Sequence, residues 1–243
     1  MSKVRAKEYQ VRIDHALATP KLQDALHKFG DAFLLAREKA FSQYDFEALR
    51  QEIADCKDEV AAHRQQYLDQ FITNAEAAGA IVYLAKTAAD ANQYIADLAR
   101  TKGVKLVTKS KSMASEETHL NQALESAGVE ALETDLGEWI IQLAGQRPSH
   151  MVMPAIHMFK EEVAELFSKV TGSEEPAEIE HLVQVAREQL RQGYLDADMG
   201  ITGANIAVAE TGGIALVTNE GNARLVSTLP KIHVALLGIE KIV

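Results

Sequence analysis

From Gly79 onward, short apolar runs alternate with segments of helical periodicity. Strands that alternate with helices at this interval usually form largely parallel sheets with helices on both faces. The alternation therefore predicts an α/β domain over residues 79–243. Strands are expected at residues 80–85, 104–108, 129–133 and 150–153, and helices at residues 87–100, 115–126, 135–143 and 159–170.

The spacing changes after a further helix, which is expected from about residue 174 to Gly193. The next expected strands lie too close together for helices between them, and such spacing is typical of a meander with antiparallel neighbours. We therefore expect a mixed, mostly parallel sheet flanked by helices. These closely spaced strands cover residues 198–202, 213–218, 223–227 and 232–237.

Residues 1–78 have a different character, with a single glycine and a single proline. Apolar residues recur there at helical spacing, which predicts an N-terminal helical arm. One run is close to a heptad seam, with Phe46, Leu49, Ile53, Cys56 and Val60. An amphipathic helix must lay its apolar stripe on the main domain, on a neighbouring helix or on a second copy of the chain. A homo-oligomer is therefore one of the expected assemblies.

The composition narrows the class of protein. With 47% apolar and 25% charged residues, the chain has the make-up of a globular protein, and its net charge of −10 argues against nucleic-acid binding. Its single cysteine, Cys56, excludes an internal disulfide and a cysteine-ligated cluster within this chain. No GxSxG, HExxH, GxGxxG or cysteine metal motif is present, so no cofactor or metal is expected within this chain. No apolar run has transmembrane length and no signal-peptide core is present, so the expected location is the cytoplasm.

The stretch from Gly200 to Asn222 alternates glycines with polar residues. Glycine lets a backbone come close to a ligand, and polar side chains on such turns beside buried strands often form small-molecule sites. Glu210 and Glu220 are the candidate catalytic carboxylates, for acid–base or covalent chemistry. The alternative is a polar hairpin with satisfied turns. The substrate-binding candidates of this stretch are Thr202, Asn205, Thr211, Asn219 and Asn222.

A second candidate site follows the strand expected at residues 104–108. The segment Lys109-Ser110-Lys111-Ser112 leads into a helix N-terminus, where free N–H groups favour anions. These four residues are therefore candidates for binding a phosphate or a carboxylate. A solvated loop with a serine cap is the alternative interpretation.

Two further residues complete the set of substrate-binding candidates. His157 follows an expected strand, and Arg224 could hold a substrate carboxylate with two hydrogen bonds. Ligands of open α/β sheets bind beyond the carboxyl ends of the strands. We therefore expect residues 109–112 and 203–224 to share one cleft that binds a small anion, with Lys109, Lys111 and Arg224 supplying the positive charge.

Several of these segments resemble the lactate utilization protein B family. The resemblance covers about residues 5–243, and it is most specific from residue 200 onward. It rests on residues 109–113 with Glu116 and Glu117, on residues 133–138, 148–150 and 154–157, and on residues 200–222, 228–230 and 238–240.

The resemblance implies a lactate-utilization (LUD) domain. It also implies the NagB/RpiA/CoA transferase-like fold, which ribose-5-phosphate isomerase, glucosamine-phosphate deaminase and coenzyme A transferases share. It implies a role in the oxidation of L-lactate to pyruvate, with the other subunits of a lactate utilization complex as partners and a small anion such as L-lactate as substrate. The family carries electrons on two [4Fe–4S] clusters in a downstream region with cysteine motifs. This chain stops at Val243, before any such motif, so we expect a fragment.

Three functional interpretations follow. The chain is the LUD domain of an electron-transfer subunit, or it is a stand-alone enzyme of the isomerase or coenzyme A transferase type that uses Glu210 or Glu220. In the third interpretation, it is a non-catalytic scaffold whose helical arm assembles the complex. Cysteines spaced for cluster ligation in the downstream sequence would favour the first, and activity on sugar phosphates or acyl-coenzyme A would favour the second.

Overall fold

The N-terminal part of the chain is helical in the structure, a computed structural model that describes residues 3–218 and 220–243. Its helices are α1 (Lys3–Leu17), α2 (Pro20–Phe41), α3 (Phe46–Ala62) and α4 (Arg64–Ala77). Local signals set their ends. Pro20 opens α2 with a φ that already suits a helix, and the Asp45 side chain accepts a hydrogen bond from the Ala48 N–H at the start of α3. The expected helical arm is therefore confirmed as helical structure.

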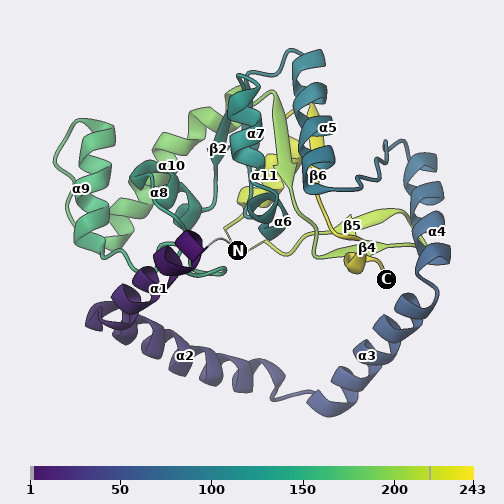
Figure 1. The fold of residues 1–243 in the computed structure, drawn as a ribbon, viewed down its shortest axis with the longest axis horizontal. Coiled ribbons are helices and arrows are strands. Elements are labelled where there is room, and N and C mark those ends of the chain that lie inside the picture. Colours follow the sequence, from purple (N-terminus) through teal and green to yellow (C-terminus); the bar gives the residue numbers. More distant parts are fainter. Residues whose placement is uncertain (1–2, 219) are drawn as a thin grey trace.

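A parallel sheet forms the centre of the remaining chain (Figure 1). Its strands within the described residues are β1 (Leu106–Lys109), β2 (Glu130–Glu133), β3 (Met199–Thr202) and β6 (Ile232–Ala235), in the order β2-β1-β3-β6. All neighbours run parallel, and β1 and β2 end in register, with Lys109 opposite Glu133. Because the strands are parallel, all of their carboxyl ends meet at one edge of the sheet.

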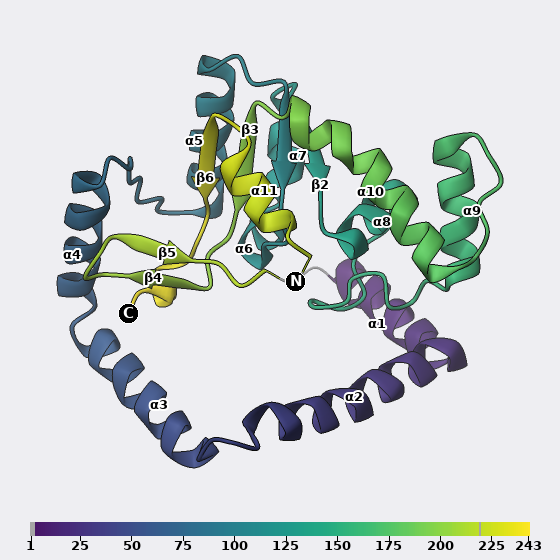
Figure 2. The same cartoon turned by 180° about the vertical axis from the view of Figure 1, so that it is seen from behind.

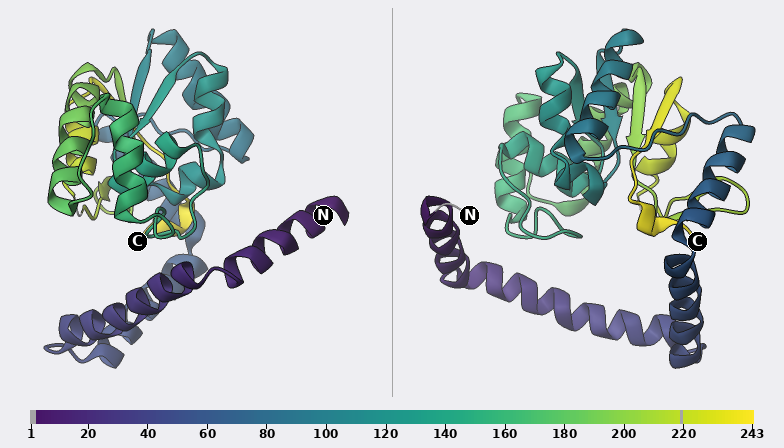
Figure 3. Two further views of the ribbon diagram at one scale, coloured as in Figure 1. Left: turned by 90° about the vertical axis from the view of Figure 1, so that its left-hand side faces the viewer. Right: turned by 45° about the vertical axis from the view of Figure 1, so that its right-hand side comes forward.

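Helices cover both faces of this sheet (Figure 3). On one face, α5 (Ala88–Thr101) and α7 (Leu120–Ser126) bury Ile95 and Leu124 against Val107 and Ile201. On the other face, α10 (Ile179–Asp196) lies against β1 and α11 (Asn222–Thr228) lies against β3. The helices of the first face share one core with the strands, whereas the buried side of α10 belongs to a second core.

A second core lies beside β2 (Figure 2). Here α8 (Leu136–Ala144) and α9 (Lys160–Thr171) pack with α10 around Phe167, which is fully buried and contacts Trp139 with ring centroids 5.1 Å apart. The Asp135 side chain caps α8 by accepting hydrogen bonds from the Gly137 and Glu138 N–H groups. These contacts fix the start of α8 next to the end of β2.

The antiparallel strands form a separate hairpin, and the expectation of one mixed sheet is corrected. β4 (Ile206–Val208) pairs with β5 (Gly213–Ala215) outside the four-stranded sheet. The hairpin packs on α4 through Phe71, Ala75 and Ala209. The short helix η1 (Ile239–Lys241) follows β6, and Ile242 bridges back to Ala207. Helix α4 therefore shares a core with the end of the chain, although the sequence suggested that the α/β domain starts only at residue 79.

Three expected strands are wrong. Residues 80–85 form an extended loop in which Ile81 is 86% exposed, while Tyr83 stacks on Tyr94 of α5 instead of pairing with a strand. Residues 150–153 turn sharply because His150 Nδ1 accepts hydrogen bonds from the Val152 and Met153 N–H groups. Residues 223–227 belong to α11, which buries Val226 against β3.

One expected helix is broken in two. Residues 115–126 fall into α6 (Met113–Glu117) and α7, because His119 between them has a left-handed φ of 57°. The Ser112 side chain caps α6 by accepting a hydrogen bond from the Ser115 N–H. The strands expected at 104–108, 129–133, 198–202 and 232–237 are confirmed, apart from shifts at their ends.

Gly200 of β3 provides a test of the packing between α11 and the sheet. An added Cβ would lie 1.9 Å from the Val226 carbonyl oxygen, so Gly200→Ala forces α11 away from β3. We expect it to lower the free energy of unfolding by at least about 2 kcal/mol in chemical denaturation. Gly30→Ala is the control, because nothing lies within 4 Å of its added Cβ and alanine favours helix. Equal stability of wild type and Gly200→Ala would contradict this packing.

Candidate functional site

A cleft of about 1370 Å³ opens at the carboxyl ends of the parallel strands. Each strand contributes the loop that follows it, with residues 110–112 after β1, 135–137 after β2, 203–205 after β3 and 236–238 after β6. This edge of an open α/β sheet is where ligands bind. The sequence suggested that residues 109–112 and 203–224 share one cleft, and the structure places part of each segment along it. These parts are residues 110–112, 203–205, 216–218, 220, 222 and 223.

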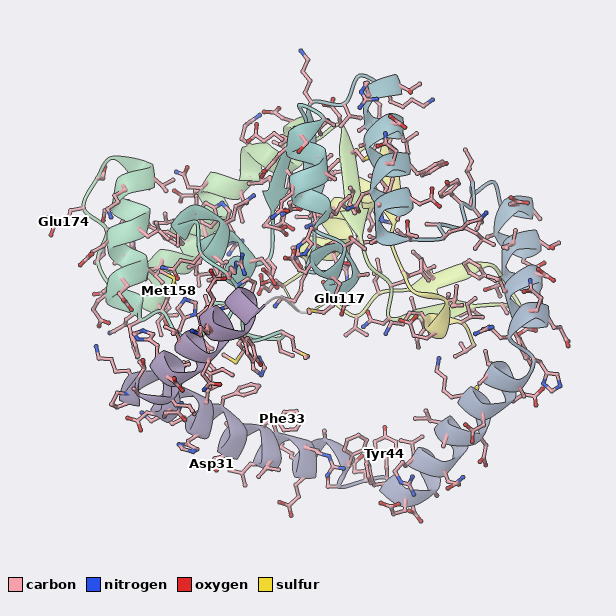
Figure 4. The ribbon with its side chains drawn as sticks, in the orientation of Figure 1. Asp31, Phe33, Tyr44, Glu117, Met158 and Glu174 are labelled. Atoms are coloured by element: carbon pink, nitrogen blue, oxygen red, sulfur yellow. The ribbon has the colours of Figure 1, made fainter. Side chains whose placement is uncertain are left out.

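Much of the remaining lining is apolar. The arm contributes Phe29 of α2, and the loop before α9 contributes Met151, Val152, Met153 and Met158. Figure 4 labels Met158 and Glu117, two lining residues from opposite sides of the cleft. Methionine side chains are flexible and polarizable, so they can adapt to ligands of different shape.

Lys109 points into the protein instead of the cleft. Its side chain is 1% exposed, and its Nζ donates hydrogen bonds to Glu133 Oε1 and Asn121 Oδ1, both at 2.6 Å. Asn121 also donates to Glu133 Oε1 at 2.7 Å, and Glu116 lies 3.5 Å from the ammonium group. Lys109 is therefore placed as a buried structural partner of Glu133, and the expectation that it faces an anion in the cleft is corrected.

Lys111 lines the cleft with part of its side chain exposed. Its Nζ lies 3.2 Å from Asp135 Oδ1 and donates a hydrogen bond of 2.8 Å to the Val152 carbonyl. Ser110 and Ser112 lie on either side of it and also line the cleft. Of these two, Ser112 caps α6, while the Ser110 N–H donates to the Ile201 carbonyl and so joins this loop to β3.

Of the two candidate catalytic glutamates, one lines the cleft and the other lies outside it. Glu220 lines the cleft, and its Oε2 accepts a hydrogen bond of 3.2 Å from the Leu136 N–H at the start of α8. Burial, followed by the nearby Asp135 carboxylate, raises the pKa of Glu220. Glu210 is exposed at the turn of the β4–β5 hairpin and does not line the cleft, and its carbonyl accepts a hydrogen bond from Asn74 of α4.

The other candidates divide between cleft and surroundings. Asn205 lines the cleft and its Oδ1 accepts from the Val217 N–H, and Asn222 lines it from the start of α11. Thr202 is buried and hydrogen-bonds to His233 Nε2 at 2.9 Å. The positions outside the lining are Thr202, Thr211 in the hairpin turn, His157, which contacts Gln146 Oε1 at 2.7 Å, and Arg224, exposed on α11. Asn219 lies outside the described residues.

Sequence reasoning missed the acidic character of this site. Among the described lining residues, the lysines are Lys111 and Lys241, and the carboxylates are Glu117, Asp135, Glu220 and Glu240. The carboxylates of Asp135 and Glu220 already hold the N–H groups at the start of α8. The run Asp135-Leu136-Gly137-Glu138 was the available signal, because an N-cap aspartate brings its charge to a helix start.

Glu138 is a further buried acid that the sequence did not mark as part of the site. It lies on α8 beside the lining residue Gly137 and is 6% exposed. Burial, together with the nearby carboxylates of Glu116 and Glu133, raises the pKa of Glu138 to about 7. The side chain is therefore partly protonated near neutral pH, unlike an ordinary glutamate.

The described residues show no group of three or more histidines, cysteines or acids that could hold a metal ion. A [4Fe–4S] cluster needs about four thiolate ligands, and the chain has one cysteine, Cys56, exposed on α3. The residues of this chain therefore do not fit such a cluster. Within the same described part, no helix is long and apolar enough to span a membrane.

The buried ion pair can be tested by stability. Lys109→Met leaves Glu133 without its cation in a buried position, and we expect a loss of about 3–5 kcal/mol in the free energy of unfolding. The double variant Lys109→Met with Glu133→Leu removes both charges and should recover a large part of that loss. If the double variant were no more stable than Lys109→Met alone, the ion pair would not be the cause.

Glu138 predicts a defined pH dependence. Its pKa is about 7 in the folded protein and near the ordinary 4.5 when unfolded, so the folded state binds the extra proton. Its contribution to stability is present below pH 4.5 and is lost as the pH rises through 7. We expect Glu138→Gln to stabilise the protein by about 1–3 kcal/mol above pH 7, measured by denaturation at several pH values. The exposed Glu165→Gln is the control, and identical pH profiles of wild type and Glu138→Gln would contradict the assignment.

Comparison with known proteins places the chain in a family. Residues 68–243 match the model of the LUD domain. The chain is 50% identical to lactate utilization protein B of Shouchella clausii over 182 residues, which are 74% of this chain and 38% of that protein. It is 41% identical to lactate utilization protein B of Bacillus subtilis over 232 residues, 95% of this chain and 48% of that protein.

A third relative is an Escherichia coli protein named "Uncharacterized electron transport protein YkgF", 39% identical over 236 residues, 97% of this chain and 50% of that protein. Several curated relatives match this chain along nearly all of its length. The chain spans about half the length of these relatives. No solved structure matches it. The chain belongs to the LUD domain family and is homologous to lactate utilization protein B.

Proposed function

We propose that the chain acts in L-lactate utilization and that its cleft binds a small carboxylate such as L-lactate or pyruvate. The observation that carries this proposal is the position of the cleft, at the carboxyl ends of the parallel strands in a chain homologous to lactate utilization protein B. Residues 110–112 and Asn205 supply polar groups, and the methionine-rich wall supplies apolar surface for the rest of the ligand.

Lys111 is the cation that we assign to the ligand carboxylate. It lines the cleft, whereas the ammonium group of Lys109 is held by Glu133 and Arg224 lies outside the lining. Binding requires Lys111 to leave Asp135 and to pair with the ligand carboxylate. One ion pair is then replaced by another. Such an exchange explains how an acidic cleft can accept an anion.

We assign this domain to an electron-transfer subunit that takes part in the oxidation of L-lactate to pyruvate in the cytoplasm. Its partners are then the other subunits of the lactate utilization complex. We expect two [4Fe–4S] clusters in a region corresponding to the half of the relatives that this chain does not match. The E. coli relative, named as an electron transport protein, supports this direction.

One observation favours a second candidate function. Glu220 lies in the cleft with a raised pKa, which suits a general acid or base in a stand-alone isomerase or a coenzyme A transferase type of enzyme. Turnover of sugar phosphates or acyl-coenzyme A by the chain, lost in Glu220→Gln and retained in the matched control Glu210→Gln, would establish it. Absence of turnover, with binding retained, would leave a binding or scaffold role.

The binding role is tested by calorimetric titration with L-lactate, pyruvate and a sugar phosphate. A charge-assisted hydrogen bond contributes roughly 1.5–3 kcal/mol, so Lys111→Ala should weaken carboxylate binding about tenfold or more. Arg224→Ala should leave the affinity unchanged, and the exposed Lys160→Ala controls for the loss of one charge. Because protonation of Glu220 removes a negative charge from the cleft, binding should also tighten as the pH falls, and Glu220→Gln should reduce this dependence.

An unchanged affinity in Lys111→Ala, or a larger loss in Arg224→Ala, would place the ligand elsewhere. No binding of any of the three ligands by the wild-type chain would contradict the proposal as a whole. Binding of the sugar phosphate alone would favour the second candidate function.

A further inference from the structure

The arm formed by α1, α2 and α3 exposes apolar surface along much of its length. Helix α2 has 22 residues, and in the described part of the chain none of them is buried. Phe33 and Leu34 are 55% and 64% exposed. Figure 4 shows Phe33 on the side of α2 that faces the space between arm and body, with Asp31 on the opposite side. A helix with this pattern stabilises itself by covering its apolar stripe.

The body of the same chain contacts the arm in the first half of α2 and near the end of α3. In the first half of α2, Lys21 Nζ lies 4.8 Å from the Phe159 ring and Phe29 packs edge-on against His150 at 5.4 Å. At the end of α3, Lys57 donates hydrogen bonds to the carbonyls of Glu240 and Ile242. Between these points the ribbon of α2 runs apart from the body (Figure 3), and residues 31–40 are all exposed.

Charge separates the part of the arm that holds α1 and α2 from α3 and the body. Residues 1–41 contain eight lysines and arginines against five aspartates and glutamates, so this part is basic. Residues 42–243 contain 17 lysines and arginines against 30 aspartates and glutamates. The basic α1–α2 part of the arm is electrostatically complementary to the acidic body of another copy.

The α9–α10 face of the body carries both exposed apolar residues and an excess of acidic residues, which would complement the apolar and basic surface of α1 and α2. Residues 160–196, which include α9 and α10, contain nine acidic and four basic residues. On α10, Ile179 and Val183 are exposed one turn apart, and Glu178 and Glu180 flank Ile179. Apolar side chains inside an acidic rim match an apolar helix stripe inside a basic rim.

We propose that the arm of one chain packs on the α9–α10 face of a second copy of this chain, and that the second arm does the same in return. Helices α1 and α2 together have 37 residues and about 55 Å of length, and a stripe about 10 Å wide covers about 550 Å² on each surface. Two reciprocal contacts bury about 2,200 Å² in total, which reaches the range of stable interfaces. One contact alone would bury only half of that. The reciprocal arrangement has the symmetry of most dimers.

The proposal is tested on the 243-residue chain by sedimentation velocity and by distances between spin labels. Wild type should be a dimer whose dissociation constant rises with salt, because the contact is partly ionic. A nitroxide on Cys56, the chain's single cysteine, should give a spin–spin distance only between two copies. Phe33→Asp and Ile179→Asp should each raise the dissociation constant about tenfold or more. Leu229→Asp, at an exposed position after α11, is the matched control and should leave it unchanged.

Mixing the two variants identifies the surfaces. In an equimolar mixture, the intact arm of the Ile179→Asp chain can pack on the intact α10 of the Phe33→Asp chain. The mixture should therefore associate more strongly than either variant alone, and less strongly than wild type. A monomeric wild type, a dimer that survives Phe33→Asp, or a mixture no more associated than its components would overturn the proposal. Thermal unfolding of each variant checks that the body remains folded. Phe33 is exposed on α2, so its replacement should leave the melting temperature of the body unchanged.

Discussion

The hydrogen-bonded ion pair between Lys109 and Glu133 holds the functional edge of the sheet together. It links the last residues of β1 and β2, and Asn121 adds α7 to the same cluster. Buried charges are tolerated only when they are paired, so each member depends on the other. Because the cluster fixes the end of β1, it also fixes the direction in which Ser110 and Lys111 enter the cleft. Lys109 is thus structural, and the partly exposed Lys111, which contacts Asp135, is the lysine that we propose for the ligand.

The cleft contains its own anions at the place where a ligand anion is expected. Asp135 and Glu220 accept hydrogen bonds from the first N–H groups of α8, and Asp135 also holds Lys111. A carboxylate ligand must compete with these side chains, and burial, followed by the nearby Asp135 carboxylate, raises the pKa of Glu220. The proposed anion binding therefore depends on protonation and on rearrangement of Lys111, in contrast to a preformed cationic cradle.

Periodicity predicted the strands and helices that are buried from both sides, since burial leaves a regular apolar signature. It failed for three apolar runs that it predicted as strands. Residues 80–85 form a loop in which Tyr83 stacks on Tyr94, residues 150–153 form a turn around His150, and residues 223–227 form part of helix α11 with Val226 buried. In the site, sequence order placed the loops along one cleft, because parallel strands end at one edge. It did not show which side chains enter the cleft, since Lys109 and Lys111 differ only in three-dimensional partners. The NagB/RpiA/CoA transferase-like fold and the boundary at residue 79 stay predictions.

The account rests on ligand binding at the carboxyl edge of the sheet, and backbone amide NMR during titration with L-lactate tests it most directly. The amides of residues 110–112, 136–137 and 203–205 should shift together and saturate with one dissociation constant, because these loops line one cleft. The amides at the β4–β5 turn around Glu210, which lies outside the cleft, should remain unchanged. Shifts centred on that turn, or no shifts in any of the three loops at saturating lactate, would contradict the account.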